Sequence, residues 1–123
     1  MKLYELEIKT ISLLRPNAQF SIGYSYNSLI WHDVNQTKPT EEEFNTKLSE
    51  LQAAEPMRQL RIQRNQLLAQ SDWRMTTDYP YSDQSAWASY RTQLRNLPES
   101  AEPALDENGN LSNVDWPTAP DAT

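Results

Sequence analysis

The residue best suited to acid–base chemistry is the single histidine, His32, which is followed by Asp33 in the sequence WHDV. Histidine titrates near neutral pH, and a neighbouring carboxylate can orient its ring. A catalytic base also needs a nucleophile or a substrate proton within hydrogen-bonding reach. The sequence has no cysteine and no Gly-x-Ser-x-Gly turn that would present an activated serine. We therefore interpret His32 as a polar residue at the end of a strand, and we predict no catalytic residue and no enzymatic activity.

Two acidic segments contain the oxygen ligands that cations need. Glu41, Glu42 and Glu43 are consecutive, and consecutive residues of a helix point in different directions, so they do not converge on one ion. The segment DENGN at 106–110 lacks the ligand spacing and the closing glutamate of a calcium loop. We predict that the first segment compensates a helix dipole, that the second is a turn, and that the chain binds no metal and no cofactor.

Phosphate binding has little support in the sequence. The chain has only two glycines, so a glycine-rich phosphate loop is excluded. Arg58, Arg61 and Arg64 lie three residues apart and form a basic stripe on the expected helix. Such a stripe is more often a solvated face that pairs with nearby acidic residues.

The net charge of −6 belongs to the C-terminal end of the chain. Residues 1–98 carry 11 acidic residues and all 11 lysines and arginines. Six acidic residues and no base follow, namely Glu99, Glu102, Asp106, Glu107, Asp115 and Asp121. An acidic chain without a basic face binds phosphate backbones and anionic lipids poorly. We therefore expect neither a nucleic acid nor a membrane as partner.

Apolar residues are few and scattered. Hydrophobic residues make up 37% of the chain, which predicts a thin core. The longest apolar runs are a few residues, too short for a transmembrane span. The first residues are followed by Glu5 and Glu7 instead of an apolar stretch, so no secretory signal is expected.

Residues 1–38 predict a small N-terminal region of a helix and a β-hairpin. The apolar spacing of LYELEIKTISLL at 3–14 favours a helix that Pro16 ends, although part of it also alternates like a strand. The segments 18–24 and 29–34 are rich in strand-forming residues and flank a turn. A two-stranded hairpin is marginal alone, so it should pack on a helix.

Residues 39–98 predict a helical region. Thr40 and Glu43 fit a capping box ahead of a helix over 41–54. Pro56 either begins a second helix over 56–71 or lies within one long helix that it kinks. Ser82 is a candidate N-cap of a third helix over 83–97.

The third helix has the clearest apolar face, and the tail that follows has none. Trp87, Tyr90, Leu94 and Leu97 recur on one side of the helix, and Pro98 is expected to end it. Residues 99–123 show no periodicity and predict an extended acidic tail. The fold class is therefore α+β, mainly α, with a small hairpin, three helices and this tail.

Tryptophans are the remaining candidates for a functional role, because aromatic residues serve both as core and as binding anchors. Trp87 lies on the clean helix face and is expected in the core. Trp73 follows the end of the second helix and is expected to cover its junction with the third. Trp116, in VDWP at 114–117, must dock on the rest of the chain or on a partner.

Three segments together resemble the small tail-assembly chaperones or tail-fibre-assembly proteins of tailed bacteriophages. The segments are RNQLLAQSDW at 64–73, YSDQSAWASYRTQLRNLP at 81–98 and VDWP at 114–117. The matching positions are Arg64, Asn65, Leu67, Leu68, Ser71, Asp72, Trp73, Trp87, Tyr90, Arg91, Leu94, Arg95, Leu97, Pro98, Trp116 and Pro117. The resemblance is strongest over residues 58–117.

The resemblance implies a non-enzymatic assembly factor that binds a phage tail or tail-fibre protein, in the host cytoplasm or on the virion tail. The alternative is a permanent virion component, such as a baseplate or tail-fibre adaptor or tip subunit, and a homo-oligomer within a tail assembly is also open. The candidate partner-binding or packing anchors are Trp73, Trp87, Tyr90, Trp116 and Pro117.

Overall fold

The computed structural model describes residues 3–120, with side chains from Glu5 onward, and these residues fall into two compact units. Unit 1 is Met1–Glu55 and unit 2 is Pro56–Thr123. Asp121, one of the acidic tail residues, lies outside the described part, as do Met1 and Lys2. The helices are α1 (Leu3–Leu14), α2 (Glu41–Ser71) and α3 (Gln84–Ser100), with short 3₁₀ turns η1 (Tyr26–Ser28) and η2 (Asp72–Met75). The predicted fold class, mainly α with minor β, is confirmed.

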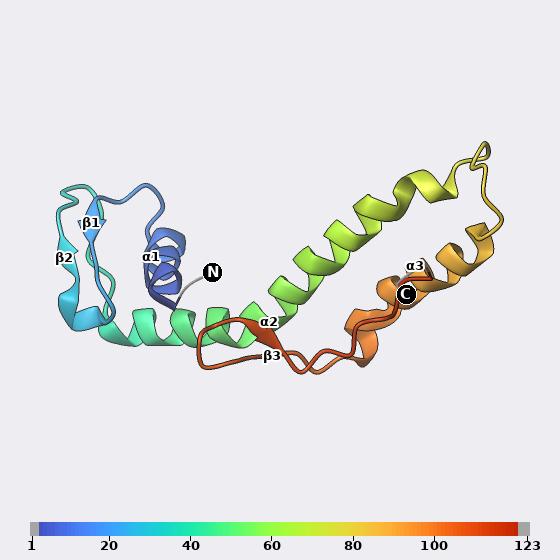
Figure 1. Cartoon of the computed structure of the whole chain (residues 1–123). Helices are drawn as coiled ribbons and strands as arrows, with labels where there is room; N and C mark the ends of the chain where they lie inside the picture. Colours follow the sequence, from blue (N-terminus) through green and yellow to red (C-terminus); the bar gives the residue numbers. More distant parts are fainter. Residues whose placement is uncertain (1–2, 121–123) are drawn as a thin grey trace. The chain divides into compact units, whose positions relative to one another are not determined.

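Unit 1 contains a helix and a hairpin (Figure 1), which pack around a small apolar core. The helical prediction for 3–14 is correct and the strand alternative is wrong. The helix ends at Leu14, two residues before Pro16. The predicted hairpin forms from β1 (Phe20–Ser21) and β2 (Ile30–Trp31), which are antiparallel and shorter than the predicted segments. Ile11 of α1, Leu29 and Phe44 of α2 form the buried core against which the hairpin packs.

The start of α2 has the capping box that the sequence predicts. The backbone N–H of Glu43 donates to Thr40 Oγ1 at 3.1 Å, and the backbone N–H of Thr40 donates to Glu43 Oε1 at 3.0 Å. These two bonds satisfy donors that a helix start otherwise leaves unpaired. Residues 41–71 form one continuous helix through Pro56 and not two helices, and the two units divide at this proline.

In unit 2, α3 packs against the second half of α2, and the C-terminal tail returns beside α3 (Figure 1). The expectation that Pro98 ends the third helix is wrong, because α3 continues to Ser100. A proline in the last turn costs the helix only one backbone hydrogen bond while its fixed φ suits the helix. Ser82 is not the N-cap either. Asp83 holds that position.

The tail of unit 2 is more ordered than predicted. The predicted turn at 106–110 closes a second hairpin, in which β3 (Ala104–Leu105) pairs antiparallel with β4 (Leu111–Ser112). Gly109 has φ 79°, a conformation that favours glycine. Within residues 3–120 no helix combines the length and the apolar character needed to cross a membrane.

Candidate functional site

The residues that could have formed a catalytic or cation site are used for local structure in unit 1. The Asp33 carboxylate accepts hydrogen bonds from the backbone N–H groups of Gln19, Asn35 and Gln36. These bonds, the one from Asn35 foremost, hold the pKa of Asp33 below its usual value. His32 lies 3.3 Å from Ser21 Oγ in an exposed position. The carboxylate therefore organises the hairpin end and does not orient the imidazole.

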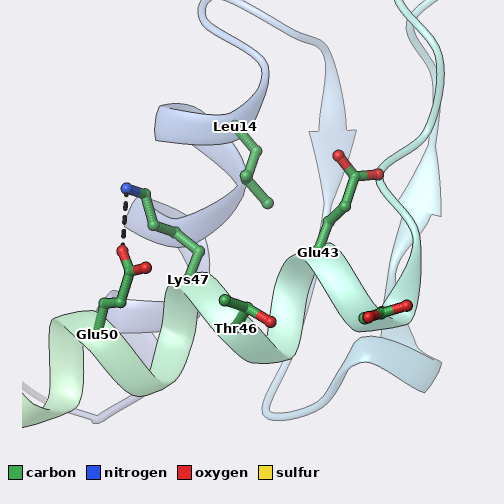
Figure 2. Close-up of a pocket in the computed structure, with 6 residues that line it drawn as sticks. Leu14, Glu43, Thr46, Lys47 and Glu50 are labelled. Carbon is green, nitrogen blue, oxygen red and sulfur yellow. Dashed lines mark hydrogen bonds and ion pairs between the residues drawn. The ribbon is translucent and has the colours of Figure 1, made fainter.

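An open hollow between the end of α1 and the start of α2 is lined by Leu14, Glu42, Glu43, Thr46, Lys47 and Glu50 (Figure 2). Lys47 Nζ lies 3.4 Å from Glu50 Oε2, and Glu43 is paired with Thr40 and with Arg15 at 3.4 Å. The hydrogen bond from the Thr40 backbone, above all, lowers the pKa of Glu43. The charges of this hollow are thus mostly paired within unit 1. No group of histidines and acidic residues in the described part of the chain is arranged to hold a metal ion.

The end of α2 is tied to α3 by one buried guanidinium in unit 2. Arg91 Nη1 donates to the carbonyl oxygen of Leu68 and to Ser71 Oγ, both at 2.6 Å, and Arg91 Nη2 donates to Asp72 Oδ1 at 2.7 Å. Arg91 is only 6% exposed. Ser71 Oγ in turn donates to the carbonyl oxygens of Leu67 and Leu68. We call Leu68, Ser71, Asp72 and Arg91 the Arg91 cluster; it satisfies carbonyls that the last turn of a helix leaves unpaired.

A second guanidinium lies over two indole rings. The Arg74 guanidinium carbon is 3.9 Å from the ring centre of Trp87 and 4.5 Å from that of Trp73. Its Nη1 donates to the Tyr79 hydroxyl at 2.9 Å and lies 4.0 Å from Asp83. A cation over an aromatic face is attracted by the ring quadrupole, so Arg74 joins the turn after α2 to the start of α3.

Asp83 is the acceptor at the centre of this group of residues. Its carboxylate accepts a hydrogen bond from the Tyr79 hydroxyl and one from Trp87 Nε1 at 3.1 Å. The bond from Tyr79 is the main reason that the pKa of Asp83 is lowered. Burial, followed by the same bond, raises the pKa of Tyr79. Because these bonds occupy its carboxylate, Asp83 forms no side-chain cap on α3.

The aromatic core of unit 2 lies beneath these polar groups. Trp87, Tyr90 and Leu94 are its buried members, and Trp87 and Tyr90 meet edge to face with ring centres 5.5 Å apart. Burial raises the pKa of Tyr90. The residues packed against this core are Leu67, Leu68, Met75, Trp116 and Ala119.

Exposed aromatic residues gather on the turn between α2 and α3. Trp73 is 49% exposed and Tyr81 is 63% exposed. Tyr79 lies between them, with its ring centre 5.4 Å from each. Trp73, Tyr79 and Tyr81, with Arg74, Ser82 and Asp83, line an open hollow of about 510 Å³. We call Trp73, Tyr79 and Tyr81 the aromatic ladder.

A model of the family described as phage tail assembly chaperone protein matches residues 57–121, which is more than half of the chain. The chain belongs to this family. The match covers nearly all of unit 2. No curated protein and no solved structure matches the chain.

Four of the five anchors predicted for this phage tail assembly chaperone either belong to the aromatic core of unit 2 or are partly exposed beside it. Trp87 and Tyr90 form the buried core with Trp116 against it, and Trp73 is half-exposed. The fifth, Pro117, is partly buried but is not part of the core. The structure thus brings Trp87, Tyr90 and Trp116 together.

The expectation that Trp73 covers the junction of the two helices stays a prediction. Residues three apart in a 3₁₀ turn share one side. In η2 these are Asp72, which bonds Arg91 of α3, and Met75, which packs on the core. Trp73 is half-exposed and stacks on Arg74, whose guanidinium also lies over Trp87 of α3.

Sequence reasoning assigned no role in the chaperone's aromatic region to Arg74, Met75, Tyr79 and Ala119, and it named Arg91 only as a position of the family resemblance. For Arg91 a signal existed, because it follows Tyr90 and precedes Leu94 by three on the apolar face of α3. A base on an apolar helix face indicates a buried partner. Arg74 and Ala119 lie outside any periodic pattern, so no such signal pointed to them.

Proposed function

We propose that this phage tail assembly protein binds a tail or tail-fibre protein through the aromatic ladder of unit 2 and keeps it competent for assembly. The observation that supports the proposal is the exposure of Trp73 and Tyr81 on either side of Tyr79. Tryptophan, tyrosine and arginine supply most hot spots of protein interfaces. The ladder has Arg74 beneath it, stacked on Trp73, so its rings are held in place before a partner arrives.

The aromatic ladder would bind its partner by burying apolar surface and would catalyse no reaction. The pairing of Tyr79 and Arg74 with Asp83 uses the polar atoms within unit 2. What remains for a partner is the faces and edges of the rings. We therefore expect the bound segment of the tail protein to be apolar or aromatic, and we expect no cofactor.

The test is binding to individually co-expressed tail and tail-fibre proteins from the same phage. Trp73→Ala is expected to weaken binding by about 2 kcal/mol, or about 30-fold in Kd. Tyr24→Ala is the matched control, because Tyr24 is 79% exposed and lies in unit 1. Equal losses for both variants would contradict the assignment to the ladder. Failure of the wild-type chain to bind any of these proteins would contradict the function.

Mass spectrometry of purified phage particles separates a transient chaperone from a permanent virion component. We expect the chain to be present during assembly in the host and absent from the mature tail. Its presence in the particle at a fixed ratio to the tail proteins would favour an adaptor or tip subunit.

A further inference from the structure

The groove between α2 and α3 in unit 2 already holds an extended peptide, which is the chain's own tail. Residues 113–120, NVDWPTAP, here called the tail segment, have no helix or strand. Trp116 and Ala119 of this segment pack against the aromatic core, next to Leu67 of α2 and Trp87 of α3. The groove therefore accommodates an aromatic residue followed three positions later by a small one.

The tail segment is held by few interactions. Residues 114–120 form no hydrogen bond with the rest of the described chain, and two of them are prolines, which lack a backbone donor. Besides the hydrogen bond from Asn113 Nδ2 to the carbonyl oxygen of Glu102 at 2.7 Å, the tail segment is held by the apolar contacts of Trp116 and Ala119. A segment without backbone pairing can leave its place without breaking a hydrogen-bonded ladder.

The groove also has space and polar groups that the tail segment does not use. One open hollow of about 460 Å³ is lined by Gln63, Gln66, Leu67, Gln70 and Trp116. A second, of about 250 Å³, is lined by Leu67, Gln70, Ser71, Arg74, Trp87, Tyr90 and Ala119. Its Arg74 also supports Trp73, so the groove is continuous with the aromatic ladder.

The glutamines of the first hollow indicate what would bind there. Gln63, Gln66 and Gln70 recur on one side of α2 and are exposed. Their side chains form no hydrogen bond with residues 3–120. An amide side chain both donates and accepts, which matches the alternating groups of a peptide backbone. The first hollow has no charged residue in its lining, so it favours an uncharged segment.

We propose that this groove is a docking site for an extended segment of the tail protein whose residues facing the groove are uncharged, and that this segment takes the place of the chain's own tail segment. The bound segment carries an aromatic residue where Trp116 lies and a small residue three positions later. Its backbone pairs with the glutamines of α2. The proposal rests on the proposed function for the source of the segment, and it adds the site, the chemistry of the segment and the competitor within the chain.

The test uses a dye-labelled synthetic peptide of residues 113–120 as the probe, added to the full-length chain and followed by fluorescence anisotropy. In the wild-type chain the attached tail segment competes with the probe. Trp116→Ala removes the competitor's main anchor, so we expect it to bind the probe at least about tenfold more tightly. A probe with alanine in place of its tryptophan is expected not to bind.

A second pair of substitutions tests the glutamines. Gln66→Glu, added to the Trp116→Ala chain, places a charge in the hollow and is expected to return probe affinity to the wild-type value or below. Gln93→Glu is the matched control, because Gln93 is exposed on α3 and is not in the lining of either hollow. Equal effects of the two changes would overturn the role of the glutamines.

The Trp116→Ala chain must retain the wild-type circular dichroism spectrum. If it does and its probe affinity is unchanged, the proposal is overturned. If it does not fold, Ala119→Asp takes its place, because it weakens the other anchor and leaves Trp116 intact. Exchange of tail segments between two copies would give a concentration-dependent dimer with unchanged probe affinity, and this result would also overturn the proposal.

Capture of the co-expressed tail protein by the same variants keeps the two proposals distinct. Capture of the tail protein without probe binding overturns the groove and leaves the proposed function. Probe binding without capture of any tail protein overturns the proposed function. Tighter capture by Trp116→Ala, in parallel with tighter probe binding, supports both.

Discussion

The two units of the chain are stabilised by different kinds of contact. In unit 1, carboxylates accept hydrogen bonds from backbone N–H groups, as Asp33 and Glu43 do, beside a small apolar core. In unit 2, two guanidiniums connect α2 and the turn after it to α3. Arg91 of α3 donates hydrogen bonds to the end of α2, and Arg74 lies over two indole rings. The family match coincides with the second arrangement. The region that matches the family therefore contains both guanidiniums that hold unit 2 together.

The largest expected effect is on the core of unit 1. Phe44 is 2% exposed and contacts the ring of Tyr26, with ring centres 5.5 Å apart. Phe44→Ala leaves a cavity that the hairpin cannot fill, and it is expected to lower the free energy of unfolding by about 4 kcal/mol. Hydrogen exchange should show the loss of protection mainly in residues 5–55. An equal loss throughout unit 2 would contradict the division into two units.

The corresponding change in unit 2 is expected to be somewhat smaller. Arg91→Ala removes three hydrogen bonds and leaves the Leu68 carbonyl without its charged donor, at a cost of about 3 kcal/mol. Arg95→Ala is the control, since Arg95 is exposed on the same helix and should change stability by less than about 0.5 kcal/mol. Urea unfolding followed by tryptophan fluorescence gives both values. Equal losses of stability for the two variants would contradict the role of the Arg91 cluster in stabilising unit 2.

The smallest effect is a gain in unit 1. Glu7 is buried, and its Oε2 has no hydrogen-bond partner among the described residues. Burial raises the pKa of Glu7, so its contribution to stability is present below the unfolded pKa and is lost as the pH rises through the folded pKa. Glu7→Gln removes the charge and is expected to stabilise the chain by about 1 kcal/mol at pH 7.

The same substitution should change stability little at a pH below the unfolded pKa of glutamate, where the wild-type carboxyl is already neutral. Thermal unfolding of both chains across this range measures the difference. A constant difference between them, independent of pH, would show that Glu7 is not the titrating group. No such pH-dependent gain is expected from Glu43, whose pKa is lowered.

Most elements of both units could be predicted from the sequence, because their signals are local. The capping box at Thr40, the helix end before Pro16 and the Asn-Gly turn depend on neighbouring residues only. The end of α3 was mispredicted because a proline in a last turn costs little. The passage of α2 through Pro56 was one of two alternatives that local rules could not separate.

The candidate site was less predictable, because its contacts join residues that are far apart in the sequence. Trp87 and Tyr90 followed from helical periodicity. The direction of Trp73 depended on the 3₁₀ turn that follows α2, which leaves no periodic pattern. The stacking of Arg74 on Trp87, 13 residues later, is a tertiary contact that propensities do not encode.

The hydrogen bond from Gln59 Nε2 to the carbonyl oxygen of Gly109 has a consequence for the order of folding. It joins residues 50 apart in the sequence, at 3.3 Å, whereas the bond from Arg15 to Glu43 in unit 1 spans 28 residues. Closing a longer loop costs more chain entropy before any contact repays it, and contacts between distant residues slow folding. Unit 1 also leaves the ribosome first. The newly made chain therefore acquires its hairpin and capping box early, and the contact of α2 with the second hairpin of unit 2 forms later.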